Sequence, residues 1–397
     1  MPYPRSPIPP CARLSRRFDA AHVENPRAEV RERLLAAGLR NKLFPGARVA
    51  ITAGSRGIGG FIPLLAGIAD AIKAAGGKPF IIPAMGSHGG AVAERQQEIL
   101  RLLGVTEETV GAPVLATMDT FDLGASESGA VAHVDKLAIV ADGIIVLGRV
   151  KTHPESVEGL ASGLLKMVTV GLGKQAGAQQ AHSHGLWESV RAVPKLTLAK
   201  TKILFGVAVV ENAYRQPLVI KVVPADCDAF LEADERLLKV AQPHVAKIPF
   251  KSLDVLVVDE IGKTISGSGM DTNVIGNWRI KGGKRDPDFY RIVALSLTKP
   301  SLGNGLGIGL ADFTTERFLR DFDPAPTFVN LLTATEPDAV NTREGTLPLA
   351  LPSDREAIEV ALFSALTKAA PRVCRIKSTA QLDEFWVSES LLKEALQ

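Results

Sequence analysis

Apolar residues in the first part of the chain fall into two alternating patterns. Some form short continuous runs, which are typical of strands covered on both faces, and others recur at helical spacing. Gly76 and Gly104 follow the two helix-type segments, where glycine commonly ends a helix. The segments that we interpret as strand, helix, strand and helix are Ala47–Ser55, Phe61–Ile72, Lys78–Ser87 and Ala91–Leu103. The order is therefore β-α-β-α.

A third apolar run, around Gly143–Leu147 within Leu137–Val150, repeats this pattern. Alternating strands and helices predict an α/β fold, with a parallel, Rossmann-like sheet covered by helices on both faces. Two prolines interrupt the pattern at residues 243–250 (PHVAKIPF), and we place a domain boundary there. We predict an N-terminal catalytic and cofactor-binding domain over 1–245 and a smaller C-terminal α/β domain over 250–397. We expect the active site in the cleft between them.

The C-terminal part shows strand-type and helix-type segments of its own. The predicted strands are Leu253–Asp259, Tyr290–Leu297 and about Arg372–Ile376, and the predicted helices lie near 355–369 and 386–396.

Composition limits the classes of protein to consider. The chain has 397 residues, of which 46% are hydrophobic and 22% charged, as in soluble globular proteins. It contains no run of about 18 uncharged apolar residues, so we expect no membrane span. The formal net charge is only +3 and evenly spread, which argues against a nucleic-acid partner.

The N-terminus and the cysteines point to a cytoplasmic protein. The opening MPYPRSPIPP has proline at five of ten positions and no apolar core, so we expect a flexible arm and no signal peptide. The three cysteines lie far apart in the sequence, which offers neither a disulfide framework nor a paired-cysteine metal site.

A glycine-rich turn, TAGSRGIGG at Thr52–Gly60, follows the first predicted strand. It is similar to a dinucleotide-binding turn, but no acidic residue follows at the end of the next strand, where the chain has Ala84–His88. We therefore interpret its glycines as steric and expect no NAD. Arg56, at the start of the following helix, is well placed to hold a carboxylate or phosphate.

Four of the seven histidines lie in segments rich in glycine and serine: His88, His153, His182 and His184. His88 and His153 directly follow predicted parallel strands, whose carboxyl ends form the ligand crevice of open α/β sheets. His182 and His184 would share a face only on a strand, so at most one of them is expected to bind a ligand.

Lys166 lies in the apolar middle of Glu158–Gln180, a segment dense in glycine and alanine. Burial of its amine would lower its pKa and suit it to covalent chemistry. The alternative is a lysine on the surface of an amphipathic helix.

In their order and spacing, these residues resemble the nickel-pincer-nucleotide lactate racemase family of 2-hydroxyacid racemases and epimerases. The family's order is an arginine, two histidines, a lysine and a third histidine, and this chain presents Arg56, His88, His153, Lys166 and His182. The resemblance implies hydride transfer from C2 of the substrate to a nickel-bound cofactor. The implied roles are acid/base catalysis by His88 and His153, carboxylate binding by Arg56, covalent cofactor attachment at Lys166, a cofactor contact at Ser55 and nickel ligation by His182.

The resemblance extends to the second domain and leaves alternatives open. Gly262–Val274 (GKTISGSGMDTNV) looks like the family's glycine-rich segment and places Arg279 near the substrate, where the family has lysine. The segment from His153 to Lys166 is longer than its counterpart in the family, so Lys174 and Lys151 remain alternative cofactor lysines.

The implied partners are a lactate-like or larger 2-hydroxyacid and cofactor-maturation proteins. Two other classes remain open. One is a divalent-metal hydrolase or lyase that uses the histidine cluster, and the other is a non-catalytic protein of the same fold that binds a nucleotide or sugar acid.

Overall fold

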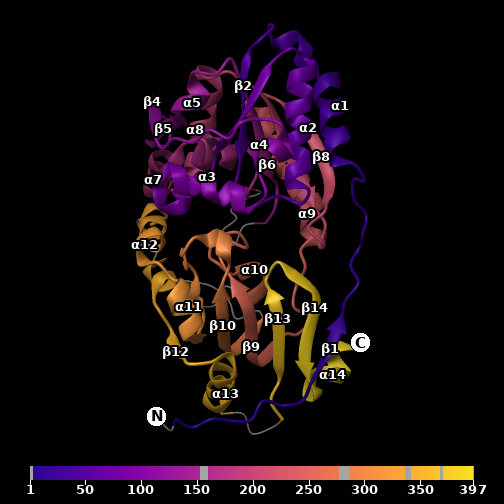
Figure 1. Cartoon of the computed structure of the whole chain (residues 1–397), viewed down its shortest axis with the longest axis vertical. Helices are drawn as coiled ribbons and strands as arrows, with labels where there is room; N and C mark the ends of the chain where they lie inside the picture. The colour runs from indigo at the N-terminus through magenta and orange to yellow at the C-terminus, as the bar shows by residue number, and fades with distance from the viewer. Residues whose placement is uncertain (1–2, 153–159, 277–286, 336–340, 367–369, 397) are drawn as a thin grey trace. The chain divides into compact units, whose positions relative to one another are not determined.

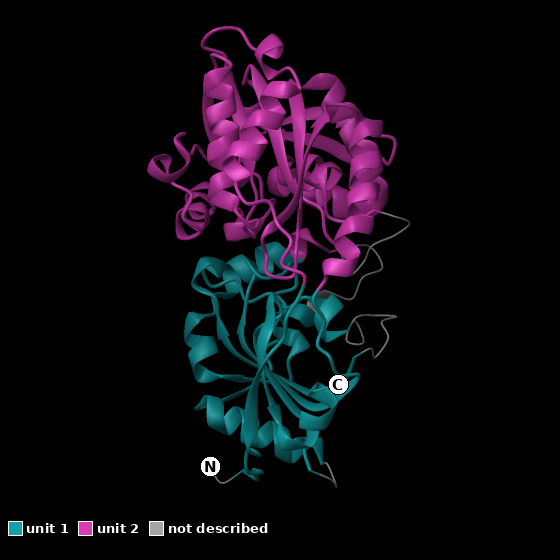
Figure 2. Cartoon of the chain, turned by 90° about the vertical axis from the view of Figure 1, so that its right-hand side faces the viewer, with its two compact units in different colours: residues 1–18, 246–331, 339–397 teal, residues 19–245, 332–338 magenta. Residues whose placement is uncertain are grey.

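The chain forms two compact units in the computed structural model, which describes residues 3–152, 160–276, 287–335, 341–366 and 370–396. Unit 1 comprises Met1–Phe18, Ala246–Leu331 and Ala339–Gln397, and unit 2 comprises Asp19–Val245 with the short segment Leu332–Asp338 (Figure 2). The chain thus passes from unit 2 to unit 1 between Val245 and Ala246. None of the described helices is long and apolar enough to cross a bilayer.

Unit 2 is built around the predicted parallel sheet. Its strand order is β3-β2-β6-β7-β8. The first four strands are parallel, and β8 runs antiparallel to β7 at the edge. The strands are β2 (Arg48–Ala53), β3 (Lys78–Pro83), β6 (Gly143–Arg149), β7 (Ile203–Glu211) and β8 (Pro217–Pro224), with a separate antiparallel pair β4 (Thr120–Ala125) and β5 (Val131–Asp135).

Helices cover both faces of this sheet, which confirms the predicted α/β architecture. Alternate strand residues such as Ala50 and Ile144 pack in one core with Leu164, Val190 and Phe230 from helices on one face. Helix α2 contacts β2 and β3, and its buried leucines lie outside that core. The helices are α1 (Pro26–Ala36), α2 (Phe61–Ala74), α3 (Ala93–Leu102), α4 (Glu107–Val110), α5 (Lys136–Ile139), α6 (Leu164–Lys166), α7 (Lys174–Ser183), α8 (Leu186–Lys200) and α9 (Cys227–Ala241) (Figure 1).

Unit 1 contains a seven-stranded sheet of order β1-β14-β13-β9-β10-β11-β12. Strand β9 pairs in parallel with β13 on one side and with β10 on the other. At one edge of the sheet, β14 pairs antiparallel with both β13 and β1. The strands are β1 (Cys11–Ser15), β9 (Ser252–Ile261), β10 (Asp288–Leu297), β11 (Phe313–Thr315), β12 (Leu349–Leu351), β13 (Val373–Ser378) and β14 (Gln381–Ser388). The helices are α10 (Thr272–Ile275), α11 (Glu316–Asp321), α12 (Pro324–Thr333), α13 (Asp354–Ala365) and α14 (Glu389–Ala395).

Two details of this unit were not expected. The residues directly after the expected flexible arm form β1 (Cys11–Ser15) against β14, and the segment Met1–Phe18 is grouped with unit 1. The helix expected near 386–396 is present but begins at Glu389. The residues before it alternate between buried and exposed positions, which is the pattern of a strand with one covered face.

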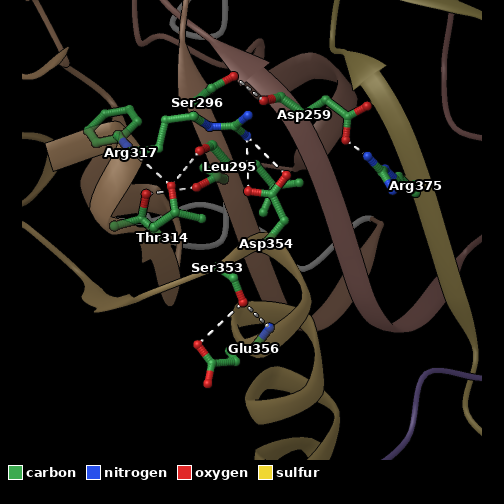
Figure 3. Close-up of polar contacts among 12 residues, drawn as sticks. Asp259, Leu295, Ser296, Thr314, Arg317, Ser353, Asp354, Glu356 and Arg375 are labelled. Carbon is green, nitrogen blue, oxygen red and sulfur yellow. Dashed lines mark hydrogen bonds and ion pairs between the residues drawn. The ribbon is translucent and has the colours of Figure 1, made fainter. Parts of the chain in front are cut away.

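Polar contacts tie neighbouring elements of unit 1 together near the carboxyl ends of its strands (Figure 3). Arg375 on β13 forms an ion pair with Asp259 on β9 at 2.7 Å. Arg317 on α11 contacts both carboxylate oxygens of Asp354 at 3.0 Å. Three of the four side chains in these pairs are more than 40% exposed, so we expect each pair to add little to stability.

Candidate functional site

A cavity of about 150 Å³ opens in unit 2 where the loops after β2, β3 and β6 meet. Strand β2 lies between β3 and β6 in the sheet. The chain goes from β2 to β3 on one side and later enters β6 on the other side. The loops at such a switch point separate and leave a crevice at the carboxyl ends of the strands. Four of the residues expected at the site line this cavity: Ser55, Arg56, His88 and Lys166.

The loop between β2 and α2 carries Arg56 and is held by the turn between β7 and β8. Arg215 in that turn donates a hydrogen bond to the backbone oxygen of Arg56 at 3.4 Å. A Cβ atom at Gly59 would lie only 1.9 Å from the backbone oxygen of Arg215. Glycine at this position is therefore required by the close approach of two backbones, in agreement with the steric interpretation of the glycine-rich turn.

The loop after β3 presents His88 and is fixed from behind by a buried glutamine. The side-chain amide of Gln96, on α3, donates to the backbone oxygens of Gly86 and His88 at 2.9 and 3.0 Å. Gln96 has no solvent exposure, so these bonds are shielded from competition with water. They hold the backbone that carries the imidazole.

Lys166 lies on a helical segment that forms one wall of the cavity. The segment runs through α6, a π-helical turn (Met167–Gly171) and α7, and π-helical turns occur frequently at functional sites. A Cβ atom at Gly171 would lie 3.0 Å from the backbone oxygen of Ala84, so glycine permits this turn to approach the loop after β3. The amine of Lys166 lies 5.2 Å from the centre of the Trp187 ring, within range of a cation–π contact.

A buried carboxylate caps the helical segment just before Lys166. Asp234 on α9 accepts hydrogen bonds from the backbone N–H groups of Leu164 and Leu165 at 2.9 and 3.1 Å. Burial raises the pKa of Asp234 to about 6, because it disfavours the charged form more than the two amide bonds favour it. The native state thus binds this proton more tightly than the unfolded chain does.

The raised pKa of Asp234 predicts how stability changes with pH. The contribution of this carboxyl to folding is fully present at low pH and is lost as the pH rises through about 6. We expect the free energy of unfolding of the wild type, relative to Asp234→Asn, to fall by about 1 kcal/mol between pH 5 and pH 7 in urea titrations. The control variant is Asp226→Asn, at the exposed end of the same helix. Its free energy of unfolding, relative to Asp234→Asn, should fall between pH 5 and pH 7 as that of the wild type does. A constant difference between wild type and Asp234→Asn would contradict the prediction.

The two alternative cofactor lysines occupy different environments. Lys151 lines the cavity together with Lys166. Lys174 does not line the cavity and has no solvent exposure. Its amine forms an ion pair with the buried Asp135 at 2.7 Å and donates to the backbone oxygen of Pro83.

Arg149, at the end of β6, also lines the cavity and was not expected there. It donates to the carboxylate of Glu211 at 2.8 Å, and both side chains are 12% exposed. With Arg149, the described lining holds four lysine or arginine side chains and no acidic one. Such a lining favours an anionic ligand. The available signal was a charged residue directly after an apolar run, at Arg149 and again at Glu211.

The other residues expected at the site are either outside the described residues or absent from the described lining of the cavity. His153 and Arg279 lie outside the described residues. His182 is on the last turn of α7 and is not among the residues that line the cavity, and His184 is exposed at the end of the same helix. Across the described part of the chain, no three His, Cys, Asp or Glu side chains are grouped to hold a metal ion. Nickel ligation by His182 stays a prediction.

Comparison of the structure with solved structures identifies a shared fold, whereas comparison of the sequence found no match. The sequence matches no family model and no curated protein. The structure is similar to the crystal structure of a protein from Thermotoga maritima, with a TM-score of 0.55 and 12% identity over 90% of this chain and 98% of that one. It is also similar to the lactate racemase apoprotein from Thermoanaerobacterium thermosaccharolyticum, with a TM-score of 0.48 and 14% identity over 90% of this chain and 92% of that one. The first of these similarities shows that the chain shares the fold of the Thermotoga maritima protein.

Proposed function

We propose that this chain is a racemase or epimerase of a 2-hydroxyacid and that it works with a nickel-pincer nucleotide attached to Lys166. The observation that carries the proposal is the position of Arg56, His88 and Lys166 on one cationic cavity. These residues come from three separate segments, and the resemblance of their spacing to the lactate racemase family assigns each a distinct role.

The chemistry of the cavity wall fits such a cofactor. Lys166 lines the cavity and its amine contacts the ring of Trp187, and this amine would hold the cofactor through an amide-type bond. The basic lining suits the phosphate of a nucleotide. When bound, the cofactor would supply a reversible hydride acceptor for C2 of the substrate. Its maturation would require partner proteins.

The residues of the chain then orient the substrate and move its hydroxyl proton. Arg56 binds the carboxylate with its planar guanidinium, which sets the position of C2. His88 takes the hydroxyl proton from one enantiomer and returns it in the reverse direction. We assign the same task for the other enantiomer to His153. Imidazole suits both tasks, because its ordinary pKa of about 6.5 lets it act as acid or base near neutral pH.

The decisive test is the covalent state of Lys166. Protein matured in its natural host, or with cofactor-maturation proteins, should carry an added mass on Lys166 and about one nickel ion per chain. Intact-mass measurement, peptide mapping and metal analysis read this out without any assay of turnover. Lys166→Arg should lose the added mass, because the guanidinium does not form the bond.

Lys151→Arg is the matched control, since Lys151 lines the same cavity. It should retain the added mass. A modification found on Lys151 would show that the assignment is in the wrong register. Exchangeable zinc or manganese without an added mass would favour the hydrolase or lyase class, and neither metal nor mass would favour a binding protein.

A further inference from the structure

The proposed function assigns the basic lining of the cavity as a whole to the cofactor phosphate and gives Arg149, one of its cations, no task of its own. Arg149 ends β6, the strand beside β2, so it lies across the switch point from the loop that carries Arg56. A substrate with one carboxylate needs one guanidinium fork, and Arg56 supplies it. A second, partly buried arginine on the same cavity therefore calls for its own explanation.

The structure beneath Arg149 contains more positive than negative charge. Glu211 accepts one bond from Arg149 and another, through its other carboxylate oxygen, from the backbone N–H of Gly59. Arg215 also lies close enough to act on this carboxylate. Burial alone would raise the pKa of Glu211, but the two arginines and the amide outweigh it and lower the pKa, so the carboxylate is ionised. One negative charge thus faces two guanidinium groups.

Excess positive charge in a partly buried cluster is unfavourable unless an anion compensates it. Among the described residues, Glu211 is the carboxylate bonded to Arg149, and it lies outside the lining of the cavity, so Arg149 can take a compensating anion from the cavity. We propose that Arg149 binds a second anionic group of the substrate, with Glu211 as the residue that positions it. The substrate is then a 2-hydroxyacid that carries a further carboxylate or phosphate. This inference rests on the proposed function, which names the first carboxylate and its partner Arg56.

An anion at Arg149 could also be the phosphate of the cofactor, and binding to the cofactor-free protein separates the two sources. The probes are L- and D-malate, which carry two carboxylates, L- and D-lactate, which carry one, and nicotinate mononucleotide, a pyridine with a phosphate. Titration calorimetry should show malate binding at least about tenfold more tightly than lactate. Arg149→Gln should weaken malate binding by about 10- to 100-fold and leave lactate binding within about threefold.

The control variant is Arg101→Gln, on the exposed face of α3, where Arg101 pairs with Glu98 in its own helix and does not line the cavity. It should bind all probes as the wild type does. Arg149→Lys keeps a charge beside Glu211 and replaces the fork by a point charge, so it should lose part of the malate preference. Thermal unfolding of each variant checks that the fold is intact, and Arg149→Lys serves if Arg149→Gln does not fold.

Three results would overturn the inference. In the first, malate and lactate bind the wild type equally well, or neither binds. In the second, Arg149→Gln weakens the binding of malate and of lactate equally, which would mean that Arg149 contributes to anion binding in general. In the third, the variant weakens only nicotinate mononucleotide, which would assign Arg149 to the cofactor. None of these results depends on the added mass at Lys166, so the inference can fail while the proposed function stands.

Discussion

Lys174→Met is expected to lower the free energy of unfolding of unit 2 by about 3 to 5 kcal/mol. The variant leaves the carboxylate of Asp135 buried without its cation, since both side chains have no solvent exposure and lie 2.7 Å apart. It also removes the bond to the backbone oxygen of Pro83, at the end of the strand that leads to His88. Urea unfolding followed by circular dichroism measures the effect.

The double variant Lys174→Met with Asp135→Asn tests the cause. Asparagine keeps an acceptor for the backbone N–H groups of Leu137 and Ala138, which Asp135 now caps, and it carries no charge. We expect the double variant to recover much of the lost free energy, because the penalty arises from an unpaired buried charge. A single variant within about 1 kcal/mol of the wild type would show that the ion pair is not structural.

His88→Ala is expected to lower the rate of racemisation of the matured enzyme by about 10² to 10⁴, the usual contribution of a positioned general acid or base. Racemisation needs a proton to be removed on one side of the substrate and delivered on the other, so the loss of either histidine slows the net reaction in both directions. Polarimetry on the enantiomers of lactate and malate measures it. His184→Ala is the control, because His184 is exposed and lies outside the cavity.

A half-reaction should survive in each histidine variant. In a single turnover stopped with acid, His88→Ala should still produce keto acid from one enantiomer, and His153→Ala should produce it from the other. If both variants lost the same enantiomer, the two-base mechanism would be wrong even with the cofactor in place on Lys166.

The elements around the cavity could be predicted because the length of each apolar run and the residues that bound it favour one type of element. Strands β2, β3 and β6 are buried on both faces and appear in the sequence as continuous apolar runs, and the glycines after the helices mark their ends. The positions of Arg56 and His88 followed from the rule that the carboxyl ends of parallel strands meet. Their convergence needed only the strand order β3-β2-β6.

Other features depend on contacts between residues far apart in the sequence. Glu211 and Gly59 are bonded across 152 positions, and Asp234 caps α6 from a helix 70 positions away. No local pattern specifies such a partner. Lys166 and Lys174 belong to one glycine-rich segment, and the sequence alone did not separate them. The structure places one at the cavity and the other in a buried ion pair.

The pairing of β1 with β14 bears on the order in which the chain completes its fold during synthesis. The residues of β1 leave the ribosome well before those of their partner β14, which begins at Gln381. At a synthesis rate of about 5 to 20 residues per second, roughly 20 to 70 s pass between the synthesis of β1 and that of β14. Unit 2 is nearly continuous in sequence and can fold during that interval. Until then the segment Met1–Phe18 presents an unpaired strand, and the prolines and charged side chains around that strand disfavour pairing with another chain.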